Sequence, residues 1–146
     1  MEEYSEACVT GEEKPSSAMN AGMKRILVVE DEGVLNSIYV SELREDGYTV
    51  IPALDGQTAL GHLENNRIDL VVLDMKLPDM SGAEVFNALK KKLPAVPVII
   101  CSAYDPEKNG FENVLSEKTE YMIKPVVLEK LKRKIKILLE AQKKAL

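Results

Sequence analysis

The chain has 146 residues, enough for one domain with a single sizeable hydrophobic core. Its composition, 45% hydrophobic and 29% charged, is that of an ordinary globular protein, and its net charge of −5 opposes direct binding to nucleic acid or an anionic membrane. The two distant cysteines match no disulfide or metal spacing, the N-terminus has no signal-peptide pattern, and no apolar run approaches the roughly 18 residues of a membrane span, so we expect a cytoplasmic protein.

Residues 1–23 collect Glu, Ser, Gly, Pro and Lys and show almost no apolar periodicity. Such a segment cannot bury enough apolar surface to offset the entropy lost on ordering. We therefore expect a disordered tail over residues 1–23 and one folded domain over residues 24–144.

From Lys24 onward, short apolar runs alternate with helical patterns five times. The runs predict strands at 25–30, 48–53, 70–74, 96–102 and 121–123. The first helical pattern carries its apolar residues at Val34, Leu35, Ile38 and Leu43 and closes at Gly47. The remaining patterns predict helices that begin at Asp55, run from Ser81 to Leu93, begin at Asp105-Pro106, and run from Leu128 to about Lys144.

This alternation predicts an α/β fold, a doubly wound five-stranded parallel sheet with helices on both faces, because right-handed crossovers place helices on the two sides. The strands are nearly continuous apolar runs, as expected where both faces are covered. The helical pattern of the fourth unit is weaker than the others, because Asn109-Gly110 interrupts it. Gly inside a helix costs about 1 kcal/mol relative to Ala. We expect that helix to be short or mobile.

Polar residues follow four of the predicted strands directly. Glu30 and Asp31 end the first, Asp74 the third, Ser102 the fourth and Lys124 the fifth. The carboxyl ends of parallel strands share one edge of the sheet, so these groups should converge there. Clustered carboxylates repel one another unless a cation intervenes, and a few hard oxygen ligands suit Mg²⁺. A carboxylate beside Mg²⁺ and an ammonium group is arranged to attack a phosphoryl group, which predicts an aspartyl-phosphate site.

Two enzyme classes fit the sequence poorly. A haloacid-dehalogenase-type phosphatase needs a second Asp two residues after the first, where Lys76 stands. A P-loop nucleotide-binding protein needs a glycine-rich phosphate loop, and neither G-x-x-x-x-G-K-[ST] nor G-x-G-x-x-G occurs.

From about Lys24 to Lys144 the chain resembles the receiver domains of two-component response regulators. The matching motifs are VVEDE at 28–32, LDMKLPDMSG at 73–82, SA at 102–103 and KP at 124–125. The resemblance implies a flavodoxin-like fold, similar to that of the chemotaxis regulator, with strand order 2-1-3-4-5. It further implies a phosphorelay protein that takes up a phosphoryl group itself, with only self-directed phosphotransfer and autodephosphorylation, and is not an enzyme in the usual sense.

The resemblance also implies the roles of the site residues. Asp74 would accept a phosphoryl group from a histidine kinase or phosphotransfer protein, and Lys124 would pair with that group. Mg²⁺ would be held by Asp31 and Asp74, by Glu30 through water, and by the backbone carbonyl of Lys76. Pro125 would follow a peptide bond that is often cis in this family.

Ser102 and Tyr121 occupy the positions of the family's switch pair, a hydroxyl that moves toward the phosphoryl oxygens and an aromatic ring that turns inward. Their movement would shift the surface formed by the helix of the fourth unit, the fifth strand and the last helix. We expect a downstream output protein or domain, or a second copy in a homodimer, to bind there, with no direct nucleic-acid or membrane contact. The resemblance also implies that Lys76 and Tyr104 occupy the two positions that flank the approach of the hydrolytic water in this family.

The alternative is a receiver fold used as a docking or dimerisation module without phosphorylation, which the intact Asp31, Asp74 and Lys124 oppose. Other residues are expected to be structural. His62 has no partner motif, and Cys101 is expected to be buried filler. The basic residues of the last helix alternate with its apolar positions and predict a solvated face; they are Lys130, Lys132, Arg133, Lys134 and Lys136.

Overall fold

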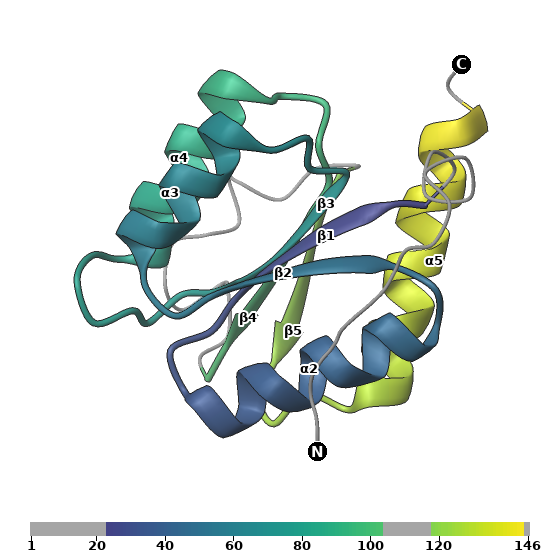
Figure 1. The fold of residues 1–146 in the computed structure, drawn as a ribbon, viewed down its shortest axis with the longest axis horizontal. Coiled ribbons are helices and arrows are strands. Elements are labelled where there is room, and N and C mark those ends of the chain that lie inside the picture. The colour runs from purple at the N-terminus through teal and green to yellow at the C-terminus, as the bar shows by residue number, and fades with distance from the viewer. Residues whose placement is uncertain (1–22, 104–117, 145–146) are drawn as a thin grey trace.

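The computed structural model describes residues 23–103 and 118–144 (Figure 1). In chain order its elements are β1 (Arg25–Val29), α2 (Gly33–Glu45), β2 (Thr49–Ala53), α3 (Gly56–Asn65), β3 (Leu70–Asp74), α4 (Gly82–Lys92), β4 (Val98–Ser102), β5 (Thr119–Ile123) and α5 (Leu128–Lys144). The five strands are parallel in the order β2-β1-β3-β4-β5, which confirms the predicted fold class. The predicted tail, apart from Met23, and the predicted helix after Asp105 lie outside the described residues.

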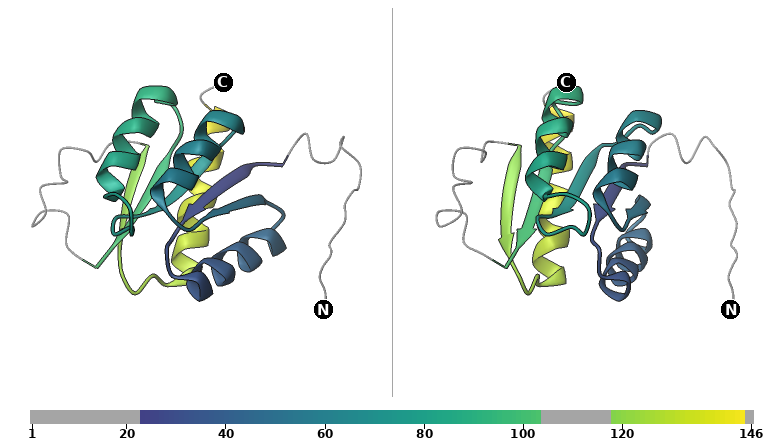
Figure 2. Two further views of the ribbon diagram at one scale, coloured as in Figure 1. Left: turned by 60° about the vertical axis from the view of Figure 1, so that its left-hand side comes forward. Right: turned by 90° about the vertical axis from the view of Figure 1, so that its left-hand side faces the viewer.

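The helices form a layer on each side of the sheet. Helices α2 and α5 cover one face, and α3 and α4 cover the other (Figures 1 and 2). Alternate residues of β1 enter the two cores: Ile26 and Val28 pack with residues of α2 and α5, and Leu27 and Val29 with residues of α3 and α4. Strands β3 and β4 are buried at every position, which explains why their sequences are continuous apolar runs.

Local signals set the helix ends as predicted. The Asp55 carboxylate accepts a hydrogen bond of 2.7 Å from the Thr58 N–H and caps α3. Ser81 and Glu84 form a reciprocal capping box at the start of α4. Gly47, just beyond α2, has a φ of 98°, a left-handed conformation that favours glycine.

The predicted buried face of α2 is wrong at two positions. Val34 and Ile38 are 71% and 46% exposed, and the buried residues of α2 are Asn36, Tyr39, Val40 and Leu43. These buried positions also follow helical three- and four-residue spacing. The apolar pattern was misleading because a polar residue, Asn36, occupies the first position of the true buried face.

Strand β5 begins at Thr119, two residues before the predicted start, and Thr119 therefore belongs to the sheet and not to the preceding helical unit. Thr119 and Glu120 pair with Val98 and Ile99 of β4. The strand has polar residues because it lies at the sheet edge in the strand order, where the Glu120 carboxylate can bond the Lys134 ammonium of α5 at 2.9 Å.

Helix α5 carries the predicted run of cations, and two of them are paired. Lys132 contacts Glu42 at 3.0 Å and Asp46 at 3.5 Å, and Lys134 contacts Glu120. The other three, Lys130, Arg133 and Lys136, are exposed. None of the described helices has the length and apolar character needed to cross a membrane.

Candidate functional site

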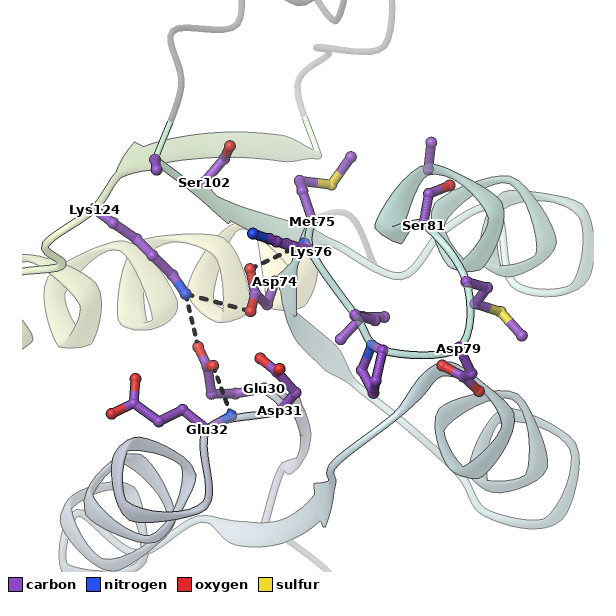
Figure 3. A pocket seen from close by; sticks show the side chains of 15 residues that line it. Glu30, Asp31, Glu32, Asp74, Met75, Lys76, Asp79, Ser81, Ser102 and Lys124 are labelled. Carbon is purple, nitrogen blue, oxygen red and sulfur yellow. Dashed lines mark hydrogen bonds and ion pairs between the residues drawn. The ribbon is translucent and has the colours of Figure 1, made fainter.

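A pocket of about 770 Å³ opens at the carboxyl edge of the sheet (Figure 3). Its walls come from the segments that follow β1, β3, β4 and β5. The structure brings together there all but one of the predicted site residues, namely Glu30, Asp31, Asp74, Lys76, Ser102 and Lys124.

Asp74 is the last residue of β3, and its side chain is only 5% exposed. Its Oδ1 accepts a hydrogen bond of 3.2 Å from the Lys76 N–H, and its Oδ2 lies 3.3 Å from the Lys124 ammonium nitrogen. Burial raises the pKa of Asp74 to about 6. The hydrogen bond from Lys76 and the charge of Lys124 act to lower this pKa, whereas the Glu30 charge adds to the rise.

Lys124 bridges two carboxylates. Its Nζ donates a hydrogen bond of 3.0 Å to Glu30 Oε1 and also contacts Asp74 (Figure 3). Burial acts to lower the pKa of Lys124, but the bonds and charges of Glu30 and Asp74 outweigh burial and raise it above its ordinary value. The backbone N–H of Lys124 donates to the Ser102 carbonyl at 2.7 Å, which ties the ends of β4 and β5 together. The Lys124-Pro125 peptide bond is cis, as the resemblance implied.

Glu30, Asp31 and Asp74 each direct one oxygen into a volume in which the three oxygens lie within 4.8 Å of one another. Glu30 and Asp74 are buried, and Asp31 is exposed. The donor set is entirely carboxylate oxygen and is partly open to water, which is the chemistry that Mg²⁺ prefers. These residues therefore fit a magnesium ion.

The two predicted switch residues lie in different surroundings. Ser102 is buried and lines the pocket, on the opposite side of Asp74 from Glu30 and Asp31 (Figure 3). Tyr121 is partly buried against the core shared with α3 and α4 and is not among the residues that line the pocket. Tyr104 lies outside the described residues.

The loop between β3 and α4 has anchors that the sequence analysis missed. The Asp79 carboxylate accepts hydrogen bonds from the N–H groups of Gly56, at 2.8 Å, and Gln57, at 2.9 Å, so it holds the loop to the start of α3. These bonds lower the pKa of Asp79. A Cβ on Gly82 would lie 2.7 Å from the Asp74 carbonyl oxygen and 2.5 Å from Met75 Cα, closer than real Cβ atoms come.

Asn36 of α2 was also missed, and its side chain bonds to the end of β1 beside Glu30. A signal for Asn36 was present in the sequence, because Asn36, Tyr39, Val40 and Leu43 share one helix face. No local pattern marks Asp79, whose partners precede it in another unit of the chain.

The chain belongs to the family of response regulator receiver domains. The sequence profile of that family, described as "Response regulator receiver domain", matches residues 26–136. This result agrees with the fold, the strand order and the acidic pocket.

Two curated relatives are transcriptional regulators. The chain is 34% identical over 114 residues to the probable transcriptional regulatory protein TcrX of Mycobacterium tuberculosis, covering 78% of this chain and 49% of the relative. It is 35% identical over 119 residues to the alkaline phosphatase synthesis transcriptional regulatory protein PhoP of Bacillus subtilis, covering 80% and 48%. The chain thus spans about half the length of these relatives.

Solved structures show the same fold. A CheY-like receiver domain protein from Methanospirillum hungatei superposes with a TM-score of 0.78 at 32% identity, covering 85% of this chain and 99% of that chain. The response regulator protein TrrA of Thermotoga maritima, solved in complex with Mg²⁺-BeF, superposes with a TM-score of 0.71 at 36% identity, covering 80% and 100%.

Proposed function

We propose that Asp74 is the phospho-acceptor of this receiver domain and takes its phosphoryl group from a phosphohistidine on a histidine kinase or phosphotransfer protein. One observation carries the proposal: Asp74 lies in an open pocket with Lys124 at 3.3 Å and with Glu30 and Asp31 close enough to share a cation. A carboxylate oxygen of Asp74 attacks phosphorus, the phosphorus–nitrogen bond breaks, and the imidazole leaves with the bonding electrons and gains a proton from water.

The neighbouring residues have separate roles in the proposed reaction. Lys124 pairs with the phosphoryl oxygens, and the Ser102 hydroxyl donates a hydrogen bond to one of them. Asp31, Asp74 and the Lys76 carbonyl would hold Mg²⁺, and Glu30 would contribute through water. When bound, the cation offsets the negative charge of the transferred group. Slow hydrolysis of the acyl phosphate returns the domain to its unphosphorylated state, and Lys76 lies beside the path of the attacking water.

A partner protein or domain recognises the phosphorylated state. We propose that Ser102 and Tyr121 shift a surface that includes β5 and α5 toward a form that binds an output protein, an output domain or a second copy of the chain. The helix predicted for the fourth unit, which the sequence analysis assigned to the same surface, lies outside the described residues. The two relatives are transcriptional regulators, which supports a regulatory output, and we expect no direct nucleic-acid binding by this acidic domain. The setting we propose is the cytoplasm.

Exposed apolar residues in segments next to the carboxyl edge of the sheet support docking of the phosphoryl donor there. Six large hydrophobic side chains are exposed among the described residues, and five belong to segments next to the carboxyl edge: Val34, Ile38, Leu54, Ile123 and Val127. The first three lie in α2 and the turn before α3, and the last two flank Lys124 in sequence. A donor protein that brings its histidine to Asp74 has to cover this edge.

The test is intact-mass spectrometry after incubation with acetyl phosphate and Mg²⁺. We expect a gain of one phosphoryl group that disappears with a chelator and in Asp74→Asn. Asp69→Asn is the matched control, because Asp69 precedes the same strand at its opposite end and bonds the Arg25 N–H, so that variant should still be modified.

No gain from acetyl phosphate, and none from a set of phosphorylated histidine phosphotransfer proteins, would contradict the proposal and favour the unphosphorylated docking or dimerisation module. A gain that persists in Asp74→Asn would assign the modification to another residue.

A further inference from the structure

Asn36 is the polar member of an otherwise apolar helix face. It is 1% exposed and shares the inner side of α2 with Tyr39, Val40 and Leu43. Burying an amide costs free energy unless its hydrogen-bonding groups find partners, so its presence there calls for a specific reason.

The side-chain amide of Asn36 bonds the ends of two strands. Its Nδ2 donates to the carbonyl oxygens of Glu30 at 3.0 Å and Ala53 at 3.1 Å, and the Val28 carbonyl lies at 3.4 Å. The two N–H hydrogens of the amide thus bond the carbonyl of Glu30, the residue after β1, and the carbonyl of Ala53, the last residue of β2. The Ala53 carbonyl also accepts the Glu30 N–H at 3.0 Å, which completes a closed set of bonds around Glu30.

The Glu30 carbonyl belongs to the peptide that joins Glu30 to Asp31. The orientation of this peptide fixes the directions in which the two acidic side chains leave the backbone. Further bonds brace the same turn: Glu30 Oε2 accepts the Glu32 N–H at 3.1 Å, and the Glu32 carbonyl accepts the Asn36 N–H at 2.9 Å. Both side chains contribute oxygens to the acidic cluster with Asp74.

We propose that Asn36 is a positioning residue that sets the geometry of the Glu30–Asp31 pair for Mg²⁺, without touching the ion itself. This inference rests on the proposed function, because it concerns the same pocket. The amide is the suitable group: an apolar side chain would remove the hydrogen bonds that Asn36 donates to the Glu30 and Ala53 carbonyls, and a carboxylate would face these carbonyl oxygens with no hydrogen to donate.

The test compares Mg²⁺ binding, measured by isothermal titration calorimetry, with stability, measured by urea unfolding. In Asn36→Ala we expect the dissociation constant for Mg²⁺ to rise about tenfold or more, the usual effect of removing a residue that orients a metal ligand. At saturating Mg²⁺ the uptake of a phosphoryl group from acetyl phosphate should recover to the wild-type extent. Asn65→Ala is the matched control, since Asn65 bonds one carbonyl of its own helix, α3.

Asn36→Ser is the second variant, to be used if Asn36→Ala fails to fold. It keeps a single donor and should also weaken Mg²⁺ binding. A folded variant that loses stability while its Mg²⁺ affinity stays at the wild-type value would overturn the proposal, because Asn36 would then only fasten α2 to the sheet.

The two proposals fail in different ways. If the wild-type chain takes up no phosphoryl group, the function is wrong. If the wild-type chain is modified with a Mg²⁺ requirement that Asn36→Ala does not change, only the role of Asn36 is wrong.

Discussion

The burial of the Asp74 carboxylate lowers the stability of the fold at neutral pH. Its carboxylate is buried beside Glu30, and its pKa of about 6 lies above the ordinary value of 3.8. Between these two pH values the folded chain binds more protons at this site than the unfolded chain does. The stability of the fold therefore decreases as the pH rises through this range, and the loss remains at neutral pH.

Replacing Asp74 with Asn should remove that loss. We expect Asp74→Asn to be more stable than the wild type by about 1–2 kcal/mol at pH 7.5, less than the full shift implies because the pocket is open to water, and to show little gain near pH 4. Urea unfolding of both proteins at the two pH values measures the difference. An equal gain at both would rule out titration of Asp74 as the cause.

The residues at strand ends were predictable because parallel strands place their carboxyl ends at one edge. This rule alone brought together Glu30, Asp31, Asp74 and Lys124, which are distant in sequence and adjacent in space. Helical spacing could have placed Asn36 on the buried face of α2, but the bonds of Asn36 and Asp79 were not predictable. These bonds depend on backbone groups of other segments, and a sequence does not show which carbonyl or N–H will be left to bond.

At the scale of elements, the β3–α4 loop is closed by a glycine. The N–H of Gly82 donates to the Met75 carbonyl at 2.9 Å, and no side chain fits at Gly82 against the backbone of Asp74 and Met75. Because this backbone carries Asp74, the proposed phospho-acceptor, the first turn of α4 and the pocket are mechanically linked.

Gly82→Ala should therefore push the end of β3 out of place. We expect a loss of about 1–3 kcal/mol of stability, typical of overpacking, and slower phosphoryl uptake by Asp74. Gly61→Ala is the control: Gly61 lies inside α3 with open space at its Cβ position, so alanine should stabilise by about 0.5–1 kcal/mol and leave uptake unchanged. Thermal unfolding and intact mass measure both effects, and equal behaviour of the two variants would contradict the linkage.

Helix boundaries were more predictable than helix faces. The caps at Asp55 and Ser81 and the glycine at 47 act within a few residues, so they are visible in the sequence. The face of α2 depends on how the helix lies on the sheet. Val34 and Ile38 were placed in the core because they are apolar, whereas both are exposed at the surface.

At the scale of the whole molecule, the exposure of Val34 and Ile38 suggests how a partner approaches the domain. The relevant test is the double variant Val34→Glu, Ile38→Glu, because charges on this exposed face should oppose docking of a protein donor while a small donor still reaches Asp74. We expect at least a tenfold slower transfer from a phosphotransfer protein that phosphorylates the wild type, and unchanged modification by acetyl phosphate.

Ile137→Glu serves as the control for this prediction. Ile137 is the remaining exposed large hydrophobic residue of the described chain and lies on α5, away from the carboxyl edge, so transfer should match the wild type. Slowing of both variants by the same factor would point to general destabilisation and not to docking.

The architecture was predictable only in part from periodicity. Alternating strands and helices indicate a parallel sheet with two covered faces, but they do not fix the order of the strands, since that order depends on long-range packing. The order β2-β1-β3-β4-β5 came from the resemblance to receiver domains, and the structure confirms it.

The acidic pocket also has a kinetic consequence. Five carboxylates line it, those of Glu30, Asp31, Glu32, Asp74 and Asp79, together with two ammonium groups, those of Lys76 and Lys124, and Lys124 is already paired with Glu30 and Asp74. The pocket therefore carries net negative charge once Asp74 ionises. Phosphohistidine and acetyl phosphate are themselves anions and are repelled by that charge. If the chain is phosphorylated as proposed, we therefore expect the cation to bind before the phosphoryl donor, and a higher concentration of donor not to substitute for the cation.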